Sequence, residues 1–149
     1  MWLGYGNTFG PDNIWLNLDN DMTNNVLMLI ALLVCHYLAD FCLTMPMMIR
    51  AKADGRNLWP IALHATIHAV LIGLCLLVYG VGWQLLLVLM MTELISHFAI
   101  DVLKAQISIR FPYWSDNRHK PYWMLYGFDQ LLHQIVVIVI WYLAINNYQ

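Results

Sequence analysis

Charged side chains are scarce in this sequence. Aspartate, glutamate, lysine and arginine make up 11% of its 149 residues, whereas hydrophobic residues make up 61% and the mean hydropathy is +0.60. A soluble domain of this length carries about twice that share of charge, so the composition predicts one compact domain embedded in a membrane. The net charge of −2 and the lack of a basic patch argue against a nucleic-acid partner.

The sequence also lacks paired cysteines and a basic leader. Cys35, Cys42 and Cys75 form no C-x-x-C pattern, and we interpret them as small buried apolar residues. Residues 1–22 contain no lysine or arginine, so we expect no cleavable signal peptide. Their mixture of aromatic residues with Gly, Asn and Pro predicts an irregular segment that lies at the membrane surface.

Four hydrophobic segments are long enough to cross a membrane as helices. We predict spans at about residues 23–43, 58–79, 83–105 and 122–145, so that residues 23–149 form an all-α bundle of four transmembrane helices.

All seven lysines and arginines lie in two of the segments outside or at the ends of these spans. They are Arg50, Lys52 and Arg56 between the first two spans, and Lys104, Arg110, Arg118 and Lys120 at or after the end of the third span and before the fourth. The positive-inside rule places both basic loops in the cytoplasm and both termini outside. We therefore predict a multi-pass protein of the bacterial inner membrane.

Ionisable residues inside the spans occur in pairs four residues apart, one pair for each span. The pairs are His36 and Asp40, His64 and His68, His97 and Asp101, and Asp129 and His133. Four residues make about one helical turn, so the members of a pair share a helix face. Every pair lies toward the basic end of its span, which predicts that all four meet at a similar depth.

Unpaired charges at these positions would each cost roughly 2.5–3.5 kcal/mol in a membrane. A divalent cation would satisfy imidazole and carboxylate groups together, with zinc first and manganese or iron as alternatives. We predict that one or two ions are held by His36, Asp40, His64, His68, His97, Asp101, Asp129 and His133. Some of these groups would instead orient the ligands. Hydrogen bonding between helices without any metal is the alternative.

Four further polar residues lie close to the pairs in the sequence. Glu93, four residues before His97, is a candidate ligand or general base, and Asp40 is a second candidate for moving a proton. Lys104 follows Asp101 by three residues and is expected to pair with it or to attract an anionic substrate. Gln130 and Gln134 are candidates for supporting hydrogen bonds.

At these residues the chain resembles an uncharacterised family of small bacterial and phage membrane proteins. The family pattern is H-x-x-x-D-F, a histidine-containing second helix, H-F-x-x-D-x-x-K and D-Q-x-x-H. It stands here at residues 36–41, at His64 and His68, at residues 97–104 and at residues 129–133. The resemblance covers about residues 30–140. These motifs are similar to those of membrane-bound metal-dependent hydrolases, and this implies hydrolysis at a metal site.

The leading hypothesis is therefore a metal-dependent hydrolase that acts on an amphiphilic or phosphate-ester substrate among the membrane lipids. A metal or proton transporter would use the same residues as binding stations. An interaction protein, such as a phage factor acting on a host membrane complex, would use the N-terminal segment and the loop at residues 111–121. A di-iron oxidoreductase is a further alternative. Homo-oligomerisation stays open.

Overall fold

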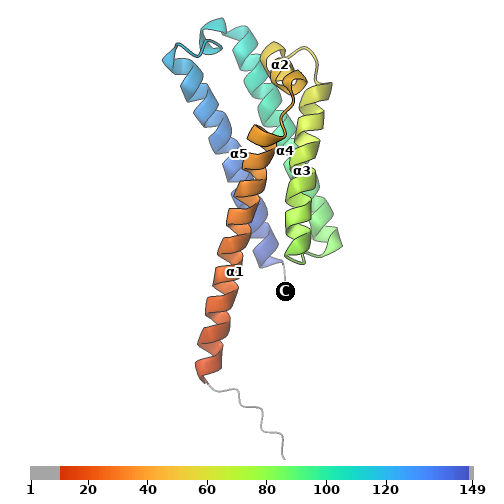
Figure 1. Ribbon diagram of the computed structural model, residues 1–149, viewed down its shortest axis with the longest axis vertical. Helices are drawn as coiled ribbons and strands as arrows, with labels where there is room; N and C mark the ends of the chain where they lie inside the picture. Colours follow the sequence, from red (N-terminus) through yellow and green to blue (C-terminus); the bar gives the residue numbers. More distant parts are fainter. Residues whose placement is uncertain (1–10, 148–149) are drawn as a thin grey trace, which may run out of the picture.

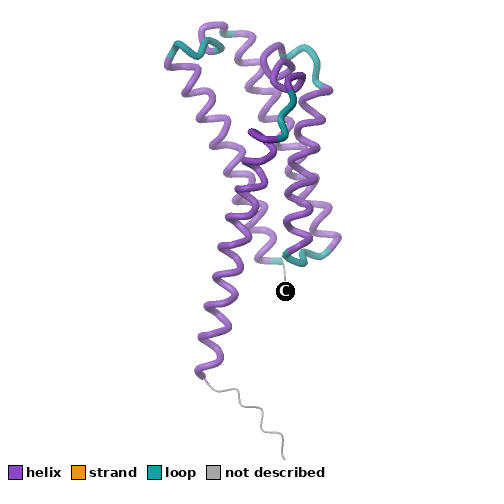
Figure 2. Tube along the Cα trace, viewed as in Figure 1, coloured by secondary structure: helices purple, strands orange, loops and turns teal. Residues whose placement is uncertain are grey.

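The protein is a bundle of helices (Figures 1 and 2). The computed structural model describes residues 11–147, which form five α-helices and no strand. These are α1 (Pro11–Tyr37), α2 (Pro46–Asp54), α3 (Trp59–Val78), α4 (Trp83–Arg110) and α5 (Lys120–Asn146). A π-helical turn, η1 (Leu38–Cys42), continues α1, and a short 3-10 turn, η2 (Pro112–Trp114), follows α4. Four helical segments are long and apolar enough to span a membrane, which confirms the predicted four-helix membrane bundle.

The first helix begins earlier than predicted. Residues 11–22 continue α1, so the expectation of an irregular segment is wrong for them. Pro11 explains the early start, because a proline at the first helical position has no N–H to lose and a preset φ. The remainder of that segment, residues 1–10, lies outside the described residues. Placement of this region at the membrane surface, and of both termini outside, stays a prediction.

The sequence analysis missed α2, which it treated as part of a polar loop. Pro46 opens this helix, and Gly55 ends it with a left-handed φ of 58°. The helix packs against α3 and α4, and Gln106 of α4 donates a hydrogen bond to the Gly55 carbonyl over 3.3 Å. The basic segment between the first two spans is therefore a structured cap on the bundle.

Each long helix has one buried stripe, and this stripe is apolar in one half of the bundle and polar in the other. In one half the stripe is apolar and forms a core that includes Leu32, Ile72, Leu89 and Val137. In the other half the same four-residue spacing places imidazoles and carboxylates in the interior. The polar half lies toward α2 and the α4–α5 connection, at the end of the bundle that carries the basic residues (Figure 1). Which side of the membrane this end faces stays a prediction.

The cysteines do not occupy the core positions predicted for them. Cys42 is exposed, and Cys35 and Cys75 are partly buried. A helix surrounded by lipid accepts small apolar residues on its outer face, so burial in protein is not required of them.

Replacement of Gly55 by alanine should destabilise the α2 cap. A Cβ there would lie 2.3 Å from Cδ1 of Ile109, and the left-handed backbone costs an L-residue roughly 1–2 kcal/mol. Thermal unfolding in detergent measures the effect. Gly127→Ala is the matched control, because a Cβ at that position meets nothing within 4 Å. Equal stability of Gly55→Ala and wild type would contradict this account of the cap.

Candidate metal centre

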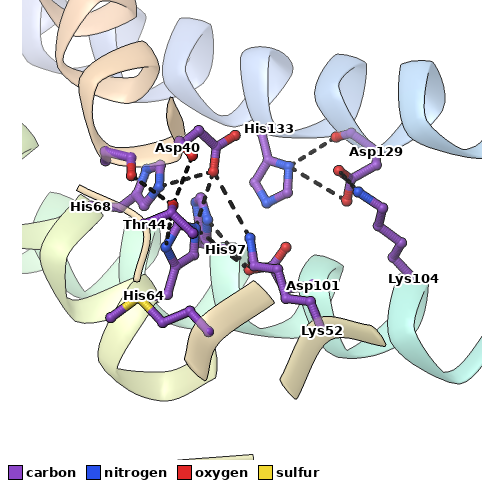
Figure 3. Close-up of polar contacts among 12 residues, drawn as sticks. Asp40, Thr44, Lys52, His64, His68, His97, Asp101, Lys104, Asp129 and His133 are labelled. Carbon is purple, nitrogen blue, oxygen red and sulfur yellow. Dashed lines mark hydrogen bonds and ion pairs between the residues drawn. The ribbon is translucent and has the colours of Figure 1, made fainter. Parts of the chain in front are cut away.

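Histidines from all four spans gather in the polar half of the bundle, and Figure 3 shows His64, His68, His97 and His133 together with Asp40. The ring centroids of His68 and His97 are 3.7 Å apart, and those of His97 and His133 are 4.1 Å apart. His36 lies 4.8 Å and His64 lies 4.6 Å from His68 by the same measure. All five imidazoles are buried. The structure thus brings together the four sequence pairs, at the common depth that their positions predicted.

A π-helical turn places Asp40 at the edge of this cluster. The N–H of Leu43 donates to the carbonyl of Leu38 over 3.0 Å, five residues back, where an α-helix would use a four-residue step. Thr44 closes the turn, because its hydroxyl donates to the Asp40 carbonyl over 2.7 Å. Such turns are rare and often mark functional positions. The turn shifts the register of η1 relative to α1, so that Asp40 faces both His64 and solvent-accessible space.

Asp40, His64 and His68 have the spacing of metal ligands. Oδ1 of Asp40 lies 3.1 Å from Nε2 of His64 and 3.4 Å from Nε2 of His68. Two ligands of a tetrahedral zinc ion, each about 2.1 Å from the metal, lie about 3.4 Å apart. These atoms and a nitrogen of His97 all lie within 4.8 Å of one another, so they make a candidate four-ligand group.

His97, Asp101 and His133 form a second candidate group on α4 and α5, and His36, His68, Glu93 and His97 form a third. Nδ1 of His133 lies 2.9 Å from the carbonyl oxygen of Asp129, and a carbonyl only accepts. Nδ1 therefore carries the proton, and the lone pair of the neutral ring lies on Nε2. The same reasoning applies to His97, whose Nδ1 is 3.2 Å from Oε1 of Glu93. This is the arrangement by which outer partners orient metal-binding imidazoles.

Several of these polar atoms have no hydrogen-bond partner among the described residues. They are both ring nitrogens of His36 and His68, Nε2 of His97 and His133, Oε2 of Glu93, and Oδ1 of Asp101 and Asp129. A buried polar atom without a partner costs roughly 1–3 kcal/mol, so a native bundle rarely accumulates so many. The donor set is imidazole and carboxylate, which suits zinc, manganese or iron.

Two lysines from the basic end balance part of the negative charge. Nζ of Lys52, on α2, lies 2.8 Å from Oδ2 of Asp101 and 3.9 Å from Oδ1 of Asp40. Nζ of Lys104 lies 2.7 Å from Oδ2 of Asp129, so the expected pair with Asp101 is wrong. The three-residue step from Asp101 turns the long Lys104 side chain toward α5, and Lys52 takes its place. Sequence spacing does not predict the ion pair of Lys52, because Lys52 lies on α2, which was not predicted.

The cluster retains a formal charge after these pairings. Asp40, Asp101, Asp129 and Glu93 contribute four negative charges, and Lys52 and Lys104 contribute two positive ones, if the histidines are neutral. One divalent cation, with a charge of +2, would balance the remaining formal charge of −2. Asp129 belongs to none of the candidate ligand groups found among the described residues, since its carboxylate is engaged by Lys104. Its role as a ligand stays a prediction.

A cleft of about 480 Å³ reaches this centre from the basic end, between η1, α2, α4 and α5. Asp40, Lys52, Lys104 and Asp129 line its wall together with Gln130. Nε2 of Gln130 donates to Oδ2 of Asp40 over 2.9 Å, which agrees with its expected supporting role. Asp40 is thus a carboxylate of a candidate ligand group that also lines the cleft, whereas Glu93 is 1% exposed and does not line it.

The remaining histidine lies apart from the centre. His119, in the α4–α5 connection, stacks on Tyr113 with ring centroids 4.2 Å apart. Nearby, hydrogen bonds from Arg118 hold the pKa of the exposed Asp116 below its usual value. These residues provide matched controls for substitutions within the bundle.

Comparison with known proteins finds one match. Residues 28–149 match the model of a family described as "Protein of unknown function (DUF3307)". No curated protein and no solved structure matches the chain.

Loss of Lys104 should destabilise the bundle by leaving Asp129 unpaired. Lys104→Gln is expected to lower the free energy of unfolding in detergent by about 1–3 kcal/mol. Addition of Asp129→Asn should restore most of this loss, because an amide pair carries no unbalanced charge. Asp116→Asn, at the exposed pair with Arg118, should leave the stability unchanged. Equal destabilisation by the single and double variants would argue against the buried pair.

Proposed function

The chain belongs to the DUF3307 family of proteins of unknown function, and we propose that it is a membrane-embedded, metal-dependent hydrolase. The observation that carries this proposal is the set of buried imidazole nitrogens and carboxylate oxygens that lie close together without hydrogen-bond partners among the described residues. Nε2 of His97, for example, lies 3.6 Å from Oδ2 of Asp101, and Glu93 engages the opposite ring nitrogen. Lys52 pairs with this Oδ2, and a divalent ion would satisfy Nε2 as well.

Three overlapping groups of residues could hold the metal, and His97 belongs to all of them. Its partners are Asp40, His64 and His68 in one group, Asp101 and His133 in the second, and His36, His68 and Glu93 in the third. This overlap leaves one ion or two as alternatives. The formal charge of −2 favours one ion in the resting protein, with a second ion drawn in only together with an anion.

Most of these residues would only hold or orient the metal, whereas Asp40 would also take part in the reaction. A divalent ion supplies a Lewis acid and makes water a nucleophile near neutral pH. Asp40 is the proton carrier that the geometry favours, because it lines the cleft and Gln130 fixes its carboxylate. Glu93 acts through His97, whose ring it orients from the buried side. We therefore assign Glu93 to positioning and give the proton transfer to Asp40.

The substrate in this proposal is an amphiphile or phosphate ester of the inner leaflet of a bacterial inner membrane. The cleft opens at the end of the bundle that carries all seven basic residues, which attract a negative headgroup. Location of that end in the cytoplasm follows from the positive-inside rule.

Transport has less support than hydrolysis. A pathway for ions or protons needs polar groups through the whole membrane. The half of the bundle opposite the basic end is filled by apolar side chains, among them Met28, Leu76 and Ile140. A site accessible from one side suits a reaction at the membrane surface better than passage across it.

Purified protein is expected to contain a stoichiometric divalent metal, measured by mass spectrometry of the detergent-solubilised chain. His64→Ala with His68→Ala, or His97→Ala alone, removes ligands and should abolish this content. His119→Ala is the matched control, since this histidine lies in the loop and should leave the metal in place. A folded wild type without metal, or unchanged metal in the cluster variants, would sink the proposed centre.

Asp40→Asn and Glu93→Gln should separate the two carboxylate roles. Asp40→Asn is expected to remove hydrolysis of phosphate-ester amphiphiles at saturating metal. Glu93→Gln should weaken metal binding by about 10–100-fold, because it disturbs the orientation of His97. Activity of Glu93→Gln should therefore return when excess metal is added. The readouts are turnover and metal affinity, and loss of turnover in Glu93→Gln at saturating metal would contradict the assignment.

A further inference from the structure

Gln134 places a polar amide on the outer surface of a membrane-spanning helix. It is exposed on α5 among leucine, valine and isoleucine residues, and the described residues offer its amide no hydrogen bond. An unsatisfied amide that faces lipid is unfavourable, so such residues usually meet a polar ligand or cavity. Gln134 lines a hollow of about 310 Å³ between α1 and α5, together with His36 of the histidine cluster.

This hollow adjoins the cleft at the basic end, because Phe41 and Gln130 line both spaces. Tyr37, Phe41 and Ile138 form the outer walls of the hollow and are 56%, 55% and 45% exposed. Because both helices are membrane spans, these walls face hydrocarbon. This hollow, called the groove below, and the adjoining cleft therefore follow one another from the lipid-facing side, past His36, to the lysines.

The cleft is suited to binding a phosphate group. Lys52 and Lys104 line it, and Ser108, Tyr122 and Tyr126 line it as well and carry hydroxyl groups. Nζ of Lys104 also lies 4.9 Å from the centroid of the Tyr126 ring. Ammonium and hydroxyl donors are the groups that bind phosphate oxygens. One divalent ion would bring the formal charge of the centre to zero, so that a phosphate anion would no longer be repelled and could accept hydrogen bonds from these donors.

We propose that the groove and cleft together bind a phosphorylated amphiphile that enters sideways from the membrane. Its phosphate lies between Lys52 and Lys104, and its hydrocarbon tail lies between α1 and α5. The inference rests on the proposed function, since it names the substrate class for the same centre. A water-soluble phosphate would use the cleft alone, and the lipid-facing groove beside His36 identifies the membrane as the source.

Photo-crosslinking in vesicles tests this assignment. The probe is phosphatidic acid with a diazirine in its acyl chain, added to phosphatidylcholine vesicles that contain the metal-loaded full chain. Mapping of the labelled peptides should find residues 33–41 of α1 and η1 and residues 134–138 of α5. The same diazirine on phosphatidylcholine should label these peptides at least about tenfold less, because it lacks the charge-assisted contacts of a phosphate monoester.

Matched variants separate the headgroup from the tail. Lys104→Gln combined with Asp129→Asn leaves the formal charge of the interior unchanged and should reduce labelling about tenfold. Lys120 is an exposed lysine outside the cleft, so Lys120→Gln should not reduce labelling. Ile138→Trp should fill the groove and reduce labelling, whereas Ile135→Trp, exposed on the same helix outside the groove, should not.

The outcomes distinguish this inference from the function on which it rests. If the protein contains metal but both lipids label it equally, the lipid site is overturned and the metal centre remains. The same conclusion follows if labelling is unchanged in Ile138→Trp and in Lys104→Gln with Asp129→Asn. Competition by inorganic phosphate without acyl labelling makes a soluble phosphate the ligand and also overturns the inference. Headgroup-selective labelling of a chain without metal supports the lipid site and overturns the hydrolase.

Discussion

The burial of unbalanced negative charge is the constraint on which this structure depends. A membrane-spanning bundle has little water in its interior, so every carboxylate there needs a cation or a donor. Lys52 and Lys104 supply two positive charges from the basic end, and the buried cluster still carries a formal −2. The position of α2, the π-helical turn and the orientation of the imidazoles bring these groups within reach of one another.

The fold was largely predictable because it depends on segment length and apolarity. Four spans and the common depth of the pairs follow from hydropathy and spacing, since a four-residue step keeps side chains on one helix face. The start of α1 at Pro11 and the existence of α2 were missed. Both segments mix polar and apolar residues, and their helical structure depends on a proline start and, for α2, on packing against α3 and α4.

The arrangement within the site was less accessible from the sequence. Spacing identified the members of each pair but not the partners across helices, and so it assigned Lys104 to Asp101 where the structure pairs it with Asp129. The part played by Lys52 depends on the tertiary position of α2. The hydrogen bond from Gln130 to Asp40 joins residues that are 90 positions apart, and only the crossing of α1 and α5 brings them together.

The apolar half of the bundle closes the centre off on one side. Leu32, Ile72 and Ile140 are fully buried there, and the core that they form among the described residues is apolar. An ion at the proposed centre would therefore exchange with the compartment that α2 faces. Its identity would depend on the free-metal pool of that compartment, so an inverted orientation in the membrane would change the occupying ion without any change in the ligands.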